Sequence, residues 1–106
     1  MEAENRAYLR IYLTIGMATR ARMLVSGDES CERTIKAGKG KFCVIAEDAS
    51  ENTKKKFTNM CKFRNIDLAI WGNKEDLGKY TGKNIRTVAV ITDSGFSGKI
   101  KELIGK

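Results

Sequence analysis

The sequence contains no histidine, no proline and only three cysteines, Cys31, Cys43 and Cys61. A nucleophilic thiol needs an activating base, and no histidine is present to supply one. The cysteines are odd in number, widely spaced and without a C-x-x-C pair, which argues against a disulfide framework and a structural zinc site. We therefore expect free thiols, no catalytic residue, no metal and no cofactor.

Long apolar runs, linkers and repeats are also missing. The chain has 106 residues, enough for one domain with a single core. None of its apolar runs approaches the ~18 residues of a membrane span. The N-terminal sequence MEAENRAYLR lacks the basic and then apolar pattern of a secretory signal. We expect a single domain over residues 1–106, forming a cytoplasmic monomer with no membrane association.

Positive charge is in excess. Lys and Arg number 20 against 13 Asp and Glu, which gives a net charge of +7 and a pI of about 9.5. A small domain this basic is typical of proteins that bind a nucleic acid. The same balance also fits an acidic protein partner, a membrane surface or simple solubility. The run from Lys54 to Lys56 fits either a solvated helix surface or phosphate contacts.

Hydrophobic periodicity predicts helices alternating with strands. Residues 5–18 show helical spacing, with an apolar face that includes Leu9, Leu13 and Met17 as well as Ile11 and Ile15. The continuous apolar run in KFCVIAED predicts a central strand that is covered on both faces. The other strands are expected over 22–27, 67–72 and 86–93, and the other helices over 29–37, 48–65, 73–82 and 94–105. This α-β-α-β-α-β-α-β-α order predicts a layered α/β sandwich with helices on both faces of the sheet.

Polar residues and one glycine predict where helices begin and end. Asp28 is expected to cap the second helix, and Gly38 to terminate it. Asp48 with Glu51 resembles a capping box for the third helix, and Asn73 is expected to open the fourth.

The stretch SGDESCER combines a glycine at a helix mouth with acidic and then basic side chains. Gly27 would let a partner's backbone approach closely, and the N–H groups of the first turn can donate to a ligand. Glu29 can accept hydrogen bonds from amino groups on base edges, while Arg33, one turn further on, can reach a base or a phosphate. This mixture suits recognition of nucleobases, although an ordinary capped amphipathic helix has a similar pattern.

Three segments, GMATRARMLVSGDES, KFCVIAEDASENTKKKF and VAVITDSGF, resemble the ribosomal protein L7Ae family of kink-turn RNA-binding proteins, and most closely its short bacterial members. The resemblance extends from about residue 9 to residue 97, in order and at the family's spacing. It implies a three-layer α/β/α sandwich with a central mixed four-stranded sheet. It also implies a non-catalytic protein whose partner is a structured RNA, ribosomal or of another kind. An interaction adaptor on the same fold, with the RNA face used for a protein, is the alternative.

The resemblance further implies which residues contact RNA. The family opens its second helix with a glycine, an Asn-Glu pair and a lysine three residues beyond the Glu. The pair reads the tandem sheared G·A pairs of the kink-turn. The glycine falls on Gly27, the pair on Glu29 and Ser30, and the lysine on Arg33. The acid is therefore displaced by one position, the Asn is absent and the lysine is replaced by arginine.

Other parts of the family's site fall further along the chain. The start of the third helix, which meets a flipped-out base, falls near Ser50 and Lys54, and the lysine that opens the fourth helix falls on Lys74. The loop before the last strand, which closes over that base and tunes the choice of target, falls on residues 85–87. The expected RNA-binding residues are Gly27, Asp28, Glu29, Ser30, Arg33, Lys36, Ser50, Lys54, Lys74, Ile85, Arg86 and Thr87.

Overall fold

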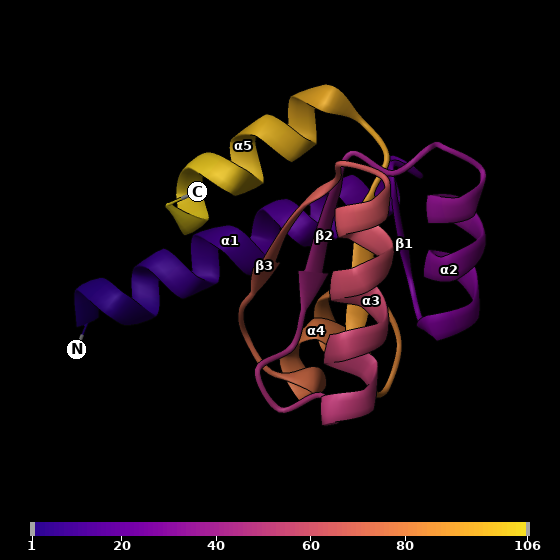
Figure 1. Cartoon of the computed structure of the whole chain (residues 1–106). Helices are drawn as coiled ribbons and strands as arrows, with labels where there is room; N and C mark the ends of the chain where they lie inside the picture. Colours follow the sequence, from indigo (N-terminus) through magenta and orange to yellow (C-terminus); the bar gives the residue numbers. More distant parts are fainter. Residues whose placement is uncertain (1, 106) are drawn as a thin grey trace.

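The computed structural model of the chain describes residues 2–105, and the side chains of residues 6–105. All the predicted helices and strands are present in the predicted order (Figure 1). They are α1 (Glu2–Arg20), β1 (Leu24–Ser26), α2 (Asp28–Lys36), β2 (Phe42–Ile45), α3 (Glu51–Phe63), β3 (Asp67–Ile70), α4 (Lys74–Tyr80), β4 (Val88–Ile91) and α5 (Ser94–Ile104).

The four strands form one mixed sheet in the order β1-β4-β2-β3. β4 runs antiparallel to both of its neighbours, and β2 runs parallel to β3. The prediction of a mixed four-stranded sheet with a central second strand is therefore confirmed. The strands are shorter than predicted because the chain turns away from the sheet before the predicted strand ends are reached. After β2, for example, Glu47 N already donates to Gly72 O, in the loop that follows β3, at 2.8 Å.

Helices cover both faces of the sheet, which confirms the three-layer architecture. Alternate residues of a strand point to opposite faces, so Phe42 and Val44 of β2 pack with α1, α4 and α5. Cys43 and Ile45 pack on the other face, with α2 and α3. Figure 1 shows α3 in front of the sheet and α1 behind it. β2 is completely buried as a result, as its continuous apolar sequence predicted.

The predicted apolar face of α1 is only partly in the core. Ile11 and Ile15 are buried, but Leu9, Leu13 and Met17 are 46%, 50% and 47% exposed. The expectation of one continuous apolar face was too broad, because only one stripe of α1 rests on the sheet and its neighbouring helices. Leu9, Leu13 and Met17 repeat every fourth residue on the side turned away from that stripe.

Two of the predicted helix caps are wrong. Gly27, not Asp28, is the N-cap residue of α2, and Asp28 lies in the first turn, where its carboxylate pairs with Lys56 Nζ at 2.7 Å. Ser50, not Asp48, caps α3 by accepting a hydrogen bond from Thr53 N. Both aspartates are instead held by partners far away in the sequence, which local spacing does not indicate.

The other two predicted helix ends are confirmed. Asn73 Oδ1 accepts a hydrogen bond from Asp76 N at 2.8 Å and caps α4. Gly38 follows α2 with a φ of +75°. Gly38 N donates to Ile35 O and Lys39 N donates to Thr34 O, which is the pair of bonds of a Schellman motif.

None of the helices in residues 2–105 combines the length and the apolar character that crossing a membrane requires.

Candidate functional site

One end of the sheet gathers most of the predicted site residues. β1, β2 and β3 all end there and β4 begins there, because β4 alone runs against the other strands. The helices α2, α3 and α4 begin at this end, at the bottom of Figure 1. We call this end the rim, and it consists of residues 26–30, 46–54, 72–74 and 85–87.

Backbone hydrogen bonds join the loops of the rim to one another. Gly27 N donates to Val88 O at 3.0 Å, and Ala46 N donates to Thr87 O at 2.8 Å. These bonds connect the loop after β1 to the start of β4, and the start of β4 to the end of β2. The relative positions of the rim residues are therefore fixed by the sheet, as precise binding of a ligand requires.

Gly27 shapes the mouth of α2. Its φ of 94° and ψ of 150° lie in a region that is essentially restricted to glycine. Gly27 is the N-cap residue and has no side chain to cap the first turn of α2, so the N–H groups of this turn are available to acceptors of a ligand. A hollow of about 300 Å³, lined by residues 26–30 and Arg86, lies in front of this turn. The arrangement combines helix-end donors with a surface that a flat group can approach.

Arg86 lies across Gly27 at the edge of the hollow. Its Nε donates to Ser26 Oγ at 3.1 Å and its Nη1 donates to Ile85 O at 3.0 Å. A Cβ atom on Gly27 would lie 3.3 Å from Arg86 Nε, so the glycine leaves the space that the guanidinium occupies. A guanidinium has five N–H groups. Within the described residues two are engaged, and three remain for a ligand.

Lys74 connects two loops of the rim through its backbone. Its N donates to Asp48 Oδ1 at 2.9 Å, and its O accepts from Arg86 N at 3.0 Å. The loop before β4 also rests directly on α4, because a Cβ atom on Gly78 would lie 2.5 Å from Asn84 O. This support holds Arg86 in place and presents Ile85, which is 51% exposed.

The remaining predicted residues of α2 and α3 differ in what they contact, and Arg33 lies in the last turn of α2 rather than at the rim. Glu29 and Arg33 are exposed, and neither forms an ion pair within the part of the chain that the structure describes. Ser50 Oγ is engaged with Thr53 as the cap of α3, and Lys54 Nζ lies 3.6 Å from Glu51 Oε1. The side chains of Glu29 and Arg33 are thus the ones most open to a ligand.

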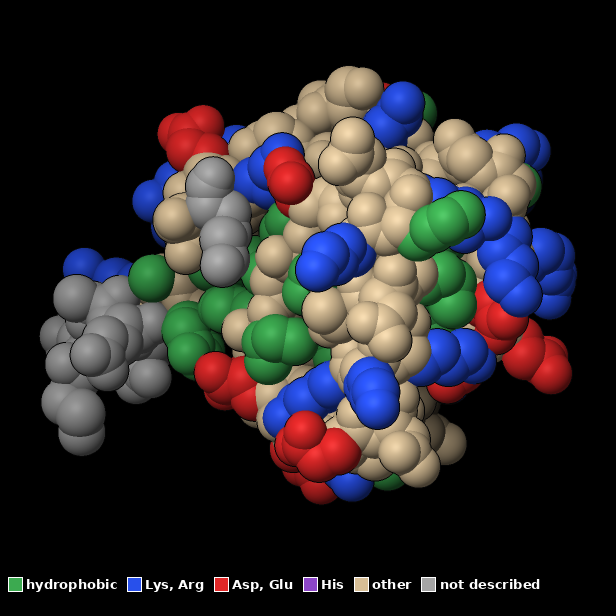
Figure 2. Space-filling model, in the orientation of Figure 1, with side chains coloured by type: hydrophobic (Ala, Val, Ile, Leu, Met, Phe, Trp, Pro, Cys, Tyr) green, Lys and Arg blue, Asp and Glu red, His purple; other side chains and the backbone are tan. Residues whose placement is uncertain are grey.

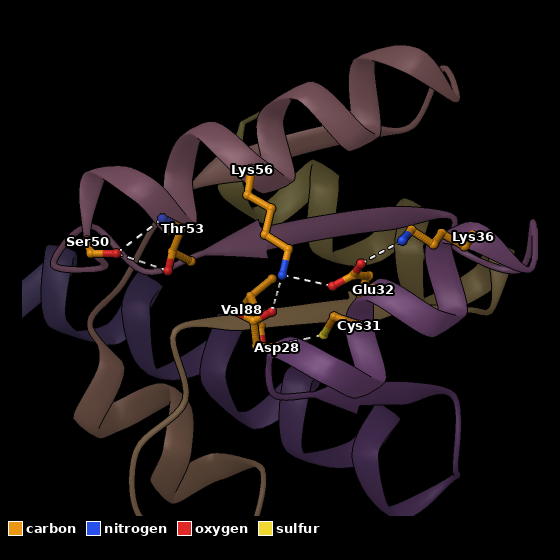
Figure 3. Close-up of polar contacts among 8 residues, drawn as sticks. All are labelled: Asp28, Cys31, Glu32, Lys36, Ser50, Thr53, Lys56 and Val88. Atoms are coloured by element: carbon orange, nitrogen blue, oxygen red, sulfur yellow. Dashed lines mark hydrogen bonds and ion pairs between the residues drawn. The ribbon is translucent and has the colours of Figure 1, made fainter.

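A chain of ion pairs joins α2 to α3 behind the hollow (Figure 3). Lys56 Nζ lies 2.7 Å from Asp28 Oδ1 and 2.8 Å from Glu32 Oε1, and Lys36 Nζ lies 2.7 Å from Glu32 Oε2. Hydrogen bonds from Lys36 and then Lys56 lower the pKa of Glu32 to about 2. Hydrogen bonds to Asp28 and then to Glu32 raise the pKa of Lys56. The negative charges of Asp28 and Glu32 are therefore balanced within the protein.

The structure does not bring Lys36 to the rim. Lys36 is the last residue of α2, ~12 Å along the helix from Asp28 at 1.5 Å per residue. Its ammonium group is already paired with Glu32. Of the predicted set, it is the residue farthest from the hollow along α2.

Sequence analysis missed two residues that organise the rim. Ser26 accepts from Arg86 across 60 positions of sequence. Asp48 was assigned to α3 but caps the backbone of Lys74, 26 positions away. No local pattern points to either contact, although the position of each residue at the end of a predicted strand is a general signal for a site.

The cysteines belong to the core. Cys31, Cys43 and Cys61 are free and buried. Burial raises the pKa of Cys31 to about 12, and its Sγ lies 3.5 Å from Val25 O and 3.6 Å from Val88 O. Cys31 is therefore a protonated thiol at neutral pH rather than a nucleophile. Among the described residues, no cluster of three or more His, Cys, Asp or Glu side chains could hold a metal ion.

Charged side chains of both signs surround the site. Figure 2 shows Lys and Arg side chains over α3 and toward the bottom of this face, with Asp and Glu side chains beside them. The hydrophobic side chains visible on this face gather mainly at the left, beside the N-terminal part of α1.

The sequence matches the model of the ribosomal protein L7Ae/L30e/S12e/Gadd45 family over residues 10–101. The chain belongs to this family. It is 36% identical to the RNA-binding protein YlxQ of Bacillus subtilis (strain 168) over 90 residues, and this match covers 85% of this chain and 90% of that protein. It is 38% identical over 90 residues to the RNA-binding protein YlxQ of Enterococcus faecium, covering 85% of this chain and 86% of that protein. The family resemblance that the sequence motifs suggested is thus confirmed.

Solved structures agree with the fold. A protein of unknown function from Bacillus halodurans superposes with a TM-score of 0.86 at 33% identity, covering 91% of this chain and 97% of that one. The 15.5kD RNA binding protein of Giardia lamblia superposes with a TM-score of 0.76 at 17% identity, covering 94% and 86%. At that lower identity the likeness concerns the fold alone.

Proposed function

We propose that this L7Ae-family protein is a non-catalytic RNA-binding protein whose target is a structured RNA that contains a kink-turn, ribosomal or of another kind. The observation that carries the proposal is the arrangement at the mouth of α2. There, Gly27 has a conformation reserved for glycine, the first helical turn is uncapped, and Arg86 lies across the glycine with unused donors. The names of the two YlxQ relatives support RNA as the ligand.

The rim offers different groups to different parts of an RNA. Glu29 and Ser30 supply acceptors for amino groups on base edges, at the helix mouth where a base pair can approach the backbone. Arg86 supplies donors for base edges or phosphates, and Arg33, outside the rim in the last turn of α2, can add a phosphate contact beside it. Lys74 and Lys54 supply positive charge for the backbone, which gives affinity without sequence selection. The exposed side chain of Ile85 provides an apolar surface for a base that has left its stack.

A protein adaptor that uses the same rim is the second candidate. The observation that favours it is the acidic charge at the hollow, because Glu29 is exposed and lines the hollow. A carboxylate there repels a phosphate, and it favours RNA only where a hydrogen bond from a base offsets that repulsion. The net charge of +7 favours RNA.

A binding comparison tests the proposal. Fluorescence anisotropy would measure affinity for a kink-turn RNA, an unkinked duplex of the same length and an unstructured single strand, each at two salt concentrations. The proposal predicts tightest binding to the kink-turn, and binding to all three that weakens as salt increases. Equal affinity for all three RNAs would contradict the kink-turn part and leave general RNA binding. No binding to any RNA at low salt would leave the adaptor.

A further inference from the structure

The exposed side of α1 carries a row of large apolar side chains. Leu9, Leu13 and Met17 repeat every fourth residue, and each is about half exposed. Of the eight large hydrophobic side chains that the described chain exposes, five lie between Tyr8 and Met23. We call Leu9, Leu13 and Met17 the α1 ridge. Contiguous exposed apolar groups of this kind mark interaction surfaces more often than single ones do.

A hollow extends the ridge toward α5. It has a volume of about 290 Å³ and lies between the second half of α1 and the first turn of α5, with Met17, Phe96 and Lys99 among its lining residues. Asp93 also lines it, but its carboxylate already accepts a hydrogen bond from Phe96 N at 2.8 Å. The space is large enough to receive an apolar side chain. Figure 1 shows α1 and α5 side by side and running in opposite directions, and the two helices are in contact.

Positive charge predominates along the described side chains of α1. Residues 6–20 contain three arginines and no aspartate or glutamate. Lys99 adds a further positive charge at the hollow. A second copy of the chain on this surface would bring Arg10 and Arg20 against the same basic face, and like charges oppose such contact. Acidic side chains on a partner would be complementary to this surface.

We propose that the α1 ridge and the hollow beside it form a docking surface for an amphipathic helix of an acidic protein partner. Apolar side chains at every third or fourth position of that helix would pack along Leu9, Leu13 and Met17, with one entering the hollow. Its aspartates and glutamates would face Arg10, Arg20 and Lys99.

The end of this surface that carries the hollow lies away from the rim. Asp93, which lines the hollow, follows the end of β4, whereas the rim lies at the beginning of that strand. A strand of four residues separates the two ends by ~13 Å. An RNA on the rim therefore leaves the hollow accessible to a helix on α1.

The experiment uses a designed probe and matched variants of the full chain. The probe is a fluorescein-labelled synthetic peptide with leucine at every third or fourth position and glutamate on its other face. A peptide of the same composition with the leucines scrambled is the control. Leu13→Gln removes an apolar side chain from the ridge without adding charge. Phe63→Gln is its match, because Phe63 is 83% exposed at the end of α3, on the other face of the sheet.

We expect the amphipathic peptide to bind the wild-type protein and to shift the amide resonances of α1 and α5 in NMR spectra. Leu13→Gln should weaken this binding about tenfold, as expected for loss of a central apolar anchor. Phe63→Gln should leave it unchanged, and Arg10→Gln should weaken it most at low salt. Leu13→Gln and Phe63→Gln should melt as the wild type does and bind RNA equally well.

Several results would overturn the proposal. Equal binding of the scrambled peptide, or resonance shifts confined to the rim, would show charge attraction rather than docking on α1. Leu13-dependent binding to vesicles of phosphatidylcholine and phosphatidylserine, without binding of the peptide, would make the occupant a membrane. A dimer mass in light scattering that Leu13→Gln converts to a monomer would make it a second copy of the chain.

Discussion

Replacing Gly27 by alanine tests both the geometry of the rim and its proposed use. The φ of 94° and ψ of 150° at this position strain any residue that has a Cβ atom, by ~1–3 kcal/mol. The new Cβ would also lie 3.3 Å from Arg86 Nε, so the guanidinium must shift. Weakening of its hydrogen bond to Ser26 adds up to ~1.5 kcal/mol. We expect Gly27→Ala to lower the free energy of unfolding by roughly 2–4 kcal/mol.

Gly38→Ala is the matched control. Gly38 also has a positive φ, of 75°, but a Cβ atom there would meet nothing within 4 Å. Only the left-handed strain of ~1–2 kcal/mol remains. Urea denaturation followed by circular dichroism would measure both variants.

The two glycines should also differ in RNA binding. Gly27→Ala displaces Arg86 and narrows the approach to the first turn of α2, so affinity for RNA should fall roughly tenfold or more, the effect of losing ~1.4 kcal/mol. Gly38→Ala lies at the other end of α2 and should bind as the wild type does. If Gly27→Ala were as stable as Gly38→Ala and bound RNA normally, the account of the helix mouth would be wrong.

Four further predictions concern single groups. Glu29→Ala removes acceptors for base amino groups, so anisotropy titrations should show the preference for a kink-turn over an unkinked duplex falling by roughly ten- to a hundredfold. Non-specific binding should stay equal or tighten. An unchanged preference would show that Glu29 contacts no base. Lys54→Ala and Lys74→Ala should each weaken binding to all RNAs similarly and lower the slope of log affinity against log salt by about one or less, which a salt titration checks. Lys36 and Lys56 lower the pKa of Glu32 to about 2 from an ordinary 4.5. The stability that these contacts contribute is therefore complete above about pH 4.5 and is lost as pH falls toward 2. Urea denaturation across that window should show a smaller acid-induced loss of unfolding free energy in Lys56→Gln than in the wild type. Alkylation followed by mass spectrometry should modify all three cysteines only after denaturation, since Cys31, Cys43 and Cys61 are buried, and a disulfide or bound zinc would contradict this.

The order of elements could be predicted because each strand and helix carries its own local pattern. The burial predicted from the continuous apolar run of β2 is confirmed, and so is the cap at Asn73, whose hydrogen-bond partner lies only three residues away. That order also predicted the layered arrangement, and the family resemblance added the mixed sheet and most of the positions that lie at the rim.

The failures share a physical cause, which is contact between residues far apart in the sequence. Asp28 and Asp48 have the composition of N-caps, but their actual partners are Lys56 and the backbone of Lys74. Helical spacing placed Leu13 on the same apolar face as Ile15, whereas the position of α1 on the sheet leaves Leu13 half exposed. Periodicity identifies an apolar face but does not show how much of it the rest of the chain covers.

The central claim is that the rim binds RNA, and an NMR titration of the isotopically labelled protein with a kink-turn RNA tests it most directly. The account predicts that the largest shifts of backbone amides occur at residues 27–30, at Lys74 and at residues 85–87, while those of α5 remain in place. Shifts centred on α1 and α5, or scattered over the lysines of every face with none concentrated at Gly27 and Arg86, would contradict it.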